Sequence, residues 1–276
     1  FMVRNSSPGI GTTSRIYRKR PTEKDMGFLK KIIDWLLNAF LIVFVMTCIW
    51  TFSQVFLLAS FRIPSDSLVE GDFVAVWKPT LGARLFDLNA TLRLEQTAIH
   101  RVPGFRRVRR GDVLVFNFPH PNGWDKIEMH ILKYYIKRCI GLPGDTLSIR
   151  DGRFRINGGS EPLGNLDSQE RIGQTPPEEF ADGIYKAFPF DSAVGWNIRD
   201  FGPLYIPKAG DRIKMDRTGY ALYRKLIAWE QKTEIEYRDS TVCLNGKPIQ
   251  EYRFQKNYYF MAGDKGKNSQ DSRYWG

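Results

Sequence analysis

LLNAFLIVFVMTCIWTFSQVFLLASF, at residues 36–61, carries no charged side chain and is followed at once by Arg62-Ile63-Pro64-Ser65-Asp66-Ser67. The apolar run exceeds the roughly 20 residues that a helix rising about 1.5 Å per residue needs to cross a bilayer. Ser67 therefore comes six residues after the end of a predicted membrane helix. A reactive serine at this position would act on a substrate presented at the membrane surface.

Positive charge is concentrated before the apolar run. The chain has 276 residues and a formal net charge of +11, and residues 1–31 hold eight Lys and Arg against two Asp and Glu. Basic residues on one flank of a membrane helix keep that flank in the cytoplasm. We therefore expect a basic cytoplasmic segment at 1–31, a transmembrane anchor at 32–61, and the rest of the chain outside the cytoplasm.

A cleaved signal peptide is the alternative interpretation of this N-terminal region. The apolar core of a signal peptide has about 7 to 15 residues and follows a short basic region. Here the apolar run is longer, and the basic stretch before it covers 31 residues. The lengths favour an uncleaved anchor.

After the anchor the sequence predicts a mainly β fold. The dipeptide Gly-Asp stands directly before four stretches with alternating apolar residues, at 73–76, 113–116, 146–149 and 212–215. Glycine permits the positive φ of a tight turn and aspartate bonds its own backbone, so each dipeptide marks a strand start. We expect an antiparallel β-sheet domain with a β-rich insertion, behind the N-terminal transmembrane helix.

Two hairpins of similar pattern support this fold class. Residues 147–158 and 235–246 alternate apolar and polar side chains around Asp151-Gly152 and Asp239-Ser240, which are suited to tight turns. The simplest interpretation is two similar β-units.

The stretch between the two hairpins has a different character. Residues 159–201 are poor in periodic pattern and rich in Gly, Pro and acidic residues, which predicts an insertion or a loop-rich cap. Residues 216–232 have helical spacing, with Leu222, Leu226 and Ile227 on one face. We expect one short helix there.

The cysteines and histidines do not predict a disulfide framework or a metal site. Cys48 lies in the membrane run, while Cys139 and Cys243 lie in strand-like stretches and could pair in an oxidising compartment. We favour buried, unpaired thiols for both. The three histidines are scattered, and we expect neither a metal nor a cofactor.

Ser67 lacks the surroundings of a Ser-His-Asp triad. The sequence has no Gly-x-Ser-x-Gly elbow, and no histidine has a carboxylate context that singles it out. A serine can also be activated by a neutral lysine. The candidate is Lys137, in YYIKRCIGLPGD at 134–145; in a strand it shares a face with Tyr135 and Cys139.

A lysine can act as a base only after losing its proton near neutral pH. Its pKa must fall by roughly 2 to 3 units from about 10.4, which burial can achieve. The alternative for Lys137 is a surface lysine whose stem lies along apolar residues.

Three separated motifs, in this order, resemble the bacterial type I signal peptidases (leader peptidases). They are Ile63-Pro64-Ser65-Asp66-Ser67 after the membrane run, residues 135–145, and Gly263-Asp264 with residues 268–276. The resemblance implies that Ser67 is the nucleophile and Lys137 its general base. It further implies that Ser65 donates to the oxyanion hole beside the Ser67 N–H, where such a donor is typically worth about 2.7–4 kcal/mol.

The tail motif adds three residues to the site that the resemblance implies. Ser269 is similar to a serine that hydrogen-bonds the lysine and orients it. Asp271 and Arg273, which we expect two apart on one strand face, resemble a structural ion pair.

The resemblance also implies an activity and a location. A chain of this family is a serine endopeptidase with a Ser-Lys dyad that removes signal peptides from exported preproteins. Its partners are signal-peptide-bearing preproteins and the lipid bilayer. It sits in the bacterial cytoplasmic (inner) membrane, with its catalytic domain on the extracytoplasmic side.

A division of the chain follows from this resemblance. We expect the first part of the catalytic β-domain at 62–158, a β-rich insertion or cap at 159–250, and the tail motif at 251–276. The family pattern continues with another strand after Gly276, so we expect the sequence to be part of a longer protein.

An extended peptide substrate can add to a strand edge and present alternate side chains to shallow apolar pockets. The residues that we expect to line these pockets are Phe61, Ile63, Leu68, Tyr135 and Ile136.

Two alternatives to the peptidase remain. One is a catalytically inactive membrane-anchored β-domain of the same fold, because the segment after Ser67 is shorter than the family pattern. The other is nucleic-acid binding by a basic stretch, Arg101, Arg106, Arg107, Arg109 and Arg110. The expected topology places this stretch outside the cytoplasm, near anionic headgroups, so we expect no nucleic-acid partner.

Overall fold

The computed structural model describes residues 23–62, 73–87, 89–90, 93, 99–120, 123–128, 134–181 and 183–276. Its internal contacts divide the chain into two compact units, Phe1–Ser53 and Gln54–Gly276. The predicted catalytic, insertion and tail segments all fall in the second unit. The finer division between them stays a prediction.

The described part of the first unit is one long helix, α1 (Glu23–Phe52), which a π-helical turn, η1 (Ser53–Leu57), follows. Together α1 and η1 contain a span, Met26–Leu57, that is long enough to cross a membrane; its most apolar 18-residue stretch has a mean hydropathy of 2.3 and no buried residues. A helix that exposes apolar side chains on all sides suits a lipid environment, because all its backbone groups bond internally. α1 therefore fits a membrane anchor.

The helix differs from the predicted anchor, 32–61, at both ends. It begins at Glu23, and the last apolar residues of the run belong to strand β1 (Leu58–Arg62). This strand pairs antiparallel with β2 (Phe73–Trp77), with Leu58 opposite Trp77 and Arg62 opposite Phe73. The β-branched and aromatic side chains of β2 favour this extended pairing over further helix.

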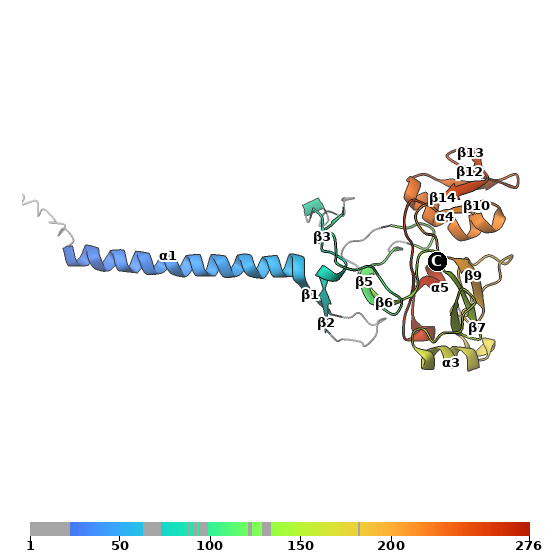
Figure 1. Cartoon of the computed structure of the whole chain (residues 1–276), viewed down its shortest axis with the longest axis horizontal. Helices are drawn as coiled ribbons and strands as arrows, with labels where there is room; N and C mark the ends of the chain where they lie inside the picture. The colour runs from blue at the N-terminus through green and yellow to red at the C-terminus, as the bar shows by residue number, and fades with distance from the viewer. Residues whose placement is uncertain are drawn as a thin grey trace, which may run out of the picture. The chain divides into compact units, whose positions relative to one another are not determined.

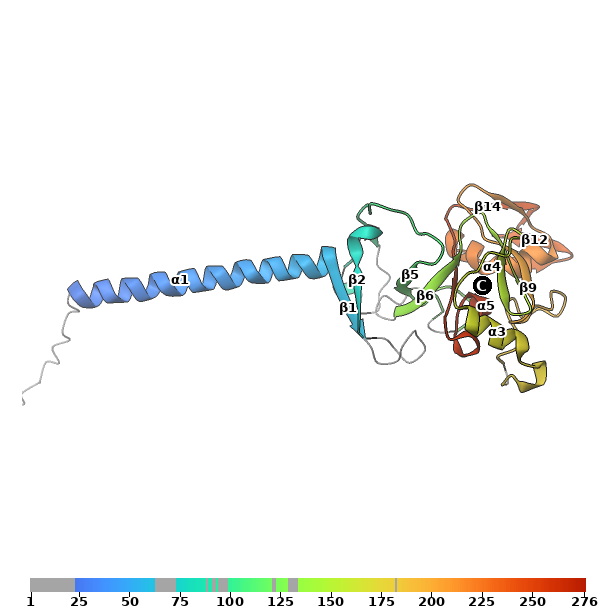
Figure 2. The same cartoon turned by 60° about the horizontal axis from the view of Figure 1, so that its bottom comes forward.

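A three-stranded antiparallel sheet forms the middle of the second unit. Its order is β15-β6-β5, with β15 at Phe260–Ala262, β6 at Tyr134–Gly141 and β5 at Val113–Asn117. β6 is buried along most of its length, although one of its faces carries Lys137 and the other Arg138. β15 brings the end of the chain beside β6. Figures 1 and 2 show β5 and β6 between the β1–β2 ribbon and the strands that follow.

The first predicted hairpin is confirmed as β7 (Thr146–Arg150) and β8 (Arg153–Ile156). Asp151 and Gly152 have φ of 48° and 78°, the positive values that a tight hairpin turn needs. β9 (Phe201–Tyr205) adds to the other side of β7. The intervening stretch forms the helix α3 (Leu166–Gln174), which we did not expect; the Asn165 side chain caps it by accepting from Ser168 N.

The second predicted hairpin is confirmed as β11 (Ile235–Arg238) and β12 (Thr241–Leu244). It gains β13 (Lys247–Ile249) on β12, so the two β-units differ in how their third strands are attached. The predicted helix is confirmed as α4 (Arg217–Gln231), whose N-cap Asp216 accepts from Gly219 N. The remaining elements are β3 (Arg84–Leu85), β4 (His100–Arg101), β10 (Arg212–Lys214), β14 (Glu251–Arg253), η2 (Lys78–Thr80), η3 (Pro177–Glu179), η4 (Gly266–Asn268) and α5 (Ser272–Trp275).

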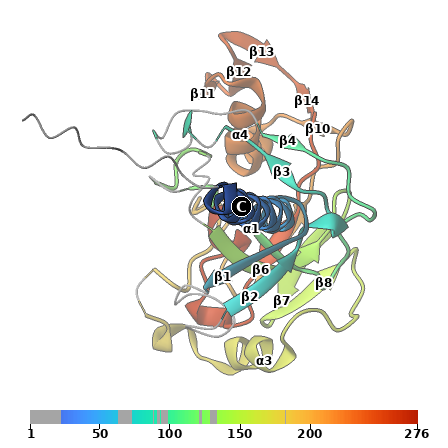
Figure 3. The ribbon, with the colours of Figure 1, turned by 90° about the vertical axis from the view of Figure 1, so that its left-hand side faces the viewer.

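Most elements from β6 onward share one hydrophobic core, a cluster of buried side chains that runs from Ile140 to Tyr274, and a smaller separate cluster holds Phe118, Tyr135 and Trp275. Within the second unit, α4 lies at one end and α3 at the other, and both Figure 1 and Figure 3 show this order. The second unit is therefore mainly β, with every paired strand antiparallel among the described residues.

Candidate active site

Lys137 lies in the middle of β6 with its side chain inside the protein. Only 1% of the residue is exposed. Its Nζ donates a 2.9 Å hydrogen bond to Ser269 Oγ and lies 5.5 Å from the centre of the Tyr135 ring. A lysine in this position is not a surface lysine, because its ammonium end is removed from bulk water.

Ser269 reaches Lys137 from the tail of the chain, between η4 and α5, and is 2% exposed. Gly263 makes room for this contact. A Cβ at Gly263 would overlap Ser269 Oγ and would lie 3.3 Å from Lys137 Nζ. Only glycine leaves the space that the lysine and the serine occupy together.

A buried ion pair fixes the tail around Ser269. Arg273 donates to the Asp271 carboxylate at 2.9 Å from Nε and 2.7 Å from Nη2, and both residues are at most 2% exposed. Asp271 Oδ2 also accepts from Gly263 N at 2.9 Å. Burial acts to lower the pKa of the Arg273 guanidinium, but the charge and hydrogen bonds of Asp271 outweigh it and raise that pKa.

The expectation that Asp271 and Arg273 share a strand face is wrong. Asp271 is the N-cap of the short helix α5, and its Oδ1 accepts from Arg273 N at 3.1 Å. An aspartate side chain satisfies the free N–H groups of a first helical turn, which favours the helix over a strand. The two side chains meet because both belong to this first turn.

Another ion pair links β6 to the tail. Arg138, the neighbour of Lys137 on β6, donates to Asp264 at 3.0 Å from Nε and 2.6 Å from Nη2. Hydrogen bonding to the Asp264 carboxylate raises the pKa of Arg138 despite its partial burial. β6 is thus joined to the tail by both the Lys137 and the Arg138 side chains.

Aromatic side chains pack against the strand of Lys137. Tyr135 stacks on Phe118 at 4.4 Å, and Trp275 meets Phe118 edge-on at 5.4 Å. The sequence motifs did not predict this cluster, although Tyr135 and Trp275, which both lie within them, were a usable signal. Tyr135 and Ile136 are 7% and 3% exposed, and their role in substrate binding stays a prediction.

Other nucleophilic or basic side chains near β6 have different properties. Burial, followed by the charges of Asp112 and Asp145, raises the pKa of the Cys139 thiol to about 12, so it stays protonated and unreactive. Burial, followed by the charge of Lys225, lowers the pKa of His120. Cys139 and Cys243 are both free thiols, and no group of metal-binding side chains occurs among the residues that the structure describes.

Not all of the predicted site residues fall within the described part of the chain. Ser65, Ser67, Ile63 and Leu68 lie outside the described residues, as does the side chain of Phe61. The structure therefore brings together the lysine, the orienting serine and the ion pair of the predicted site.

A sequence-family model described as "Signal peptidase, peptidase S26" matches residues 32–188, more than half of the chain. The chain belongs to the S26 signal peptidase family. This match includes the anchor, the segment with Ser67 and the whole of β6, and it identifies the chain as a serine peptidase by family.

Signal peptidases from several bacteria are similar to the chain. Signal peptidase I of Pseudomonas aeruginosa is 27% identical over 271 residues, which is 94% of this chain and 70% of the relative. Signal peptidase I of Buchnera aphidicola subsp. Schizaphis graminum is 27% identical over 82% of this chain and 67% of the relative. Signal peptidase I of Leptolyngbya laminosa is 36% identical over a shorter stretch, 42% of this chain and 44% of the relative.

Proposed function

We propose that this chain is a membrane-anchored serine endopeptidase that removes signal peptides from exported preproteins, with Ser67 as nucleophile and Lys137 as general base. The observation that carries the proposal is the burial of Lys137 together with its bond to Ser269. Family membership and similarity to bacterial signal peptidase I support the substrate class.

Burial supports Lys137 as a base. Removing an amine from water disfavours its charged form, so the neutral amine with a free lone pair becomes accessible near neutral pH. The bond to Ser269 Oγ uses one N–H and fixes the direction of that lone pair. An arginine could not replace this group, because it does not deprotonate in proteins.

The reaction then proceeds in two stages. Ser67 Oγ attacks the scissile carbonyl as its proton moves to Lys137 Nζ, and the Ser67 N–H and the Ser65 hydroxyl stabilise the oxyanion. When the C–N bond breaks, Lys137 gives this proton to the leaving amine, and the signal peptide remains as an ester on Ser67. Lys137 next accepts a proton from the attacking water and returns it to Ser67 Oγ when the ester bond breaks.

The anchor supports a substrate that is itself in the membrane. Tethering the enzyme and the substrate to one bilayer raises the effective concentration of their encounter. We place the chain in the bacterial cytoplasmic membrane, with residues from 62 onward on the extracytoplasmic side, because the basic segment precedes the anchor. The predicted segments 62–158, 159–250 and 251–276 keep their proposed roles of catalytic part, cap and tail.

The test is cleavage of a purified preprotein by the full chain in detergent. We expect the wild type to release the mature protein, and Ser67→Ala and Lys137→Ala to lose this activity. The exposed Ser192→Ala and Lys247→Ala are matched controls that should retain it. Cleavage that survives both site variants would overturn the dyad, and absence of cleavage by the folded wild type would favour the inactive β-domain.

A further inference from the structure

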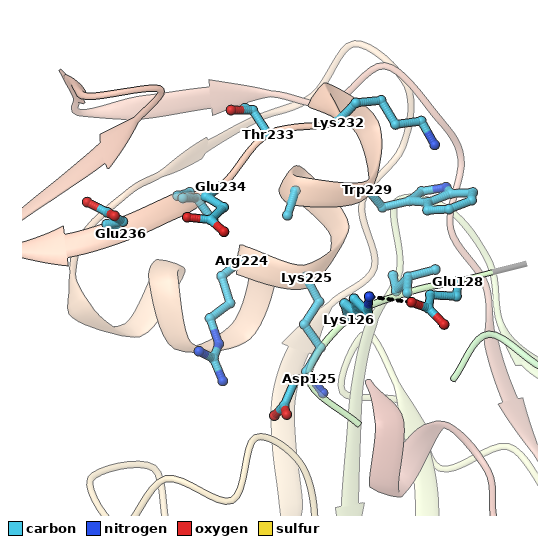
Figure 4. Close-up of a pocket in the computed structure, with 13 residues that line it drawn as sticks. Asp125, Lys126, Glu128, Arg224, Lys225, Trp229, Lys232, Thr233, Glu234 and Glu236 are labelled. Atoms are coloured by element: carbon cyan, nitrogen blue, oxygen red, sulfur yellow. Dashed lines mark ion pairs between the residues drawn. The ribbon is translucent and has the colours of Figure 1, made fainter. Parts of the chain in front are cut away.

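A pocket of about 560 Å³ lies between α4, the start of β11 and the segment Asp125–Glu128. Figure 4 shows Arg224, Lys225 and Trp229 of α4 on the wall of this pocket, across from Asp125 and Lys126. Its volume is typical of ligand-binding pockets. The proposed peptidase mechanism uses none of these residues.

Three cations of this region rest on aromatic rings. The contacts are Arg224 with Tyr220 at 5.7 Å, Lys225 with Phe188 at 5.5 Å and Lys232 with Trp229 at 3.8 Å. None of the three cations belongs to an ion pair within the described parts of the chain. A ring holds a cation in place without neutralising it, so the positive charge remains available to a ligand.

Two of the acidic residues in the pocket are already paired. Glu128 binds Lys126 at 2.5 Å, and Glu236 binds Arg238 at 2.7 Å. The charged residues of the pocket that remain outside the ion pairs of the described residues are two carboxylates, Asp125 and Glu234, and the three cations that rest on rings. The α4 side of the pocket therefore has an excess of positive charge.

Lys225 is the most enclosed of these cations. Burial, followed by the charge of Arg224, lowers its pKa to about 8, and the charge of Asp125 acts in the opposite direction. An added carboxylate would relieve the repulsion and favour the protonated amine. The apolar lining from Ala228 and Trp229 would accept the aliphatic part of a peptide side chain.

The pocket is connected to the candidate active site through packed rings. His120 stacks on Trp124 at 6.0 Å and meets Phe118 at 6.3 Å, and Phe118 stacks on Tyr135, whose ring lies beside Lys137 Nζ. Each step is short, and Trp124 directly precedes the segment that lines the pocket.

We propose that this pocket binds acidic side chains of the mature segment of a preprotein, the residues that follow the cleaved bond. The inference rests on the proposed peptidase function and extends it to a second contact with the same substrate. A signal peptide has a basic start, an apolar core and small residues at its end, so it brings no carboxylate to the pocket. The mature segment can bring one.

Binding is tested first, without cleavage. The probe is a fluorescent decapeptide with four Glu residues, compared with its Gln counterpart, on the full chain in detergent. We expect the wild type to bind the acidic probe more tightly than the Gln probe. The Kd for the acidic probe should be at least about five-fold higher in Lys225→Met than in the wild type, and higher again in Lys225→Glu. Lys247→Met, which removes an exposed charge from β13, should leave Kd unchanged.

Cleavage is tested second, on preproteins whose mature segments carry either Glu or Gln. Lys225→Met should raise KM for the Glu substrate with little change in kcat, and should not affect the Gln substrate. Equal Kd values for the two probes, or equal effects of Lys225→Met and Lys247→Met, would overturn the inference. Charge-dependent binding without any cleavage would overturn the peptidase proposal and leave the pocket as an acidic-peptide site.

Discussion

Lys137 Nζ and Ser269 Oγ lie 2.9 Å apart although 132 positions separate the two residues in the sequence. The contact depends on the antiparallel pairing of β15 with β6, which places the tail of the chain beside the lysine. Both residues are buried, so their geometry is fixed by packing on every side. The burial and hydrogen bonding of the lysine are therefore properties of the fold and not of its local sequence.

Gly263→Ala should reduce activity more than stability. The new Cβ would overlap Ser269 Oγ and crowd Lys137 Nζ, so the lysine and serine must move apart. We expect kcat/KM to fall at least about ten-fold, which corresponds to about 1.4 kcal/mol of lost transition-state stabilisation. Gly27→Ala, in α1 with open space around its Cβ, is the control and should keep full activity. Wild-type kcat/KM in Gly263→Ala would show that the glycine does not set this geometry.

Breaking the Asp271–Arg273 pair should destabilise the second unit strongly. Asp271→Asn leaves a buried guanidinium without its counter-charge, and the loss of one partner from a buried pair typically costs about 3–5 kcal/mol. Thermal unfolding in detergent measures the loss. The matched control is Arg212→Met, which removes an exposed pair with Glu251 and should cost less than about 1 kcal/mol. Similar losses in the two variants would contradict a structural role for the buried pair.

Asp216→Ala should weaken α4 and the pocket that it lines. The carboxylate accepts from Gly219 N at 3.0 Å, and loss of such a cap typically costs about 1 kcal/mol. Asp167→Ala is the control, since Asp167 lies in the first turn of α3 but does not cap it. Chemical denaturation measures the free energy of unfolding of both variants. An equal effect of both variants would mean that the cap contributes nothing beyond its charge.

Lys225 should make stability depend on pH in the alkaline range. Burial lowers its pKa from 10.5 to about 8, so between these two pH values the unfolded chain binds more protons than the folded chain. Stability from this group therefore rises as pH increases from about 8 to about 10.5, by on the order of 1 kcal/mol after allowing for its partial exposure. Below pH 8 the buried charge opposes folding.

The measurement is the difference in free energy of unfolding between the wild type and Lys225→Met at pH 7.5 and pH 10. At the higher pH the free energy of unfolding of the wild type should increase relative to that of the variant. A constant difference would show that Lys225 titrates normally in the folded chain.

Local patterns predicted much of the fold. The four Gly-Asp dipeptides that were expected to start strands each precede one, as in β7 and β10, because the turn and the alternation are encoded within a few residues. The same holds for α4, whose Leu222 and Ile227 are buried at helical spacing. α3 was missed because it is short and mostly polar, and its start depends on the Asn165 cap and on packing of Ile172.

Local sequence patterns predicted less of the candidate site than of the fold. Periodicity placed Lys137 in a strand, but its contact with Ser269 was anticipated only through a family resemblance. The helix that begins after Asp271 was mistaken for a strand, since two residues of alternating pattern do not distinguish the two. The pocket beside Lys225 joins three distant segments, and no pattern within any one of them indicates it.

Activation of Ser67 by a neutral lysine predicts a defined pH dependence of kcat/KM for preprotein cleavage. This profile reports the ionisation of the free enzyme's catalytic groups. Activity should rise through one ionisation at least about two pH units below the usual lysine value of about 10.4, and then level off. A kcat/KM that increases without levelling up to pH 10, or that does not change with pH at all, would contradict Lys137 as the base.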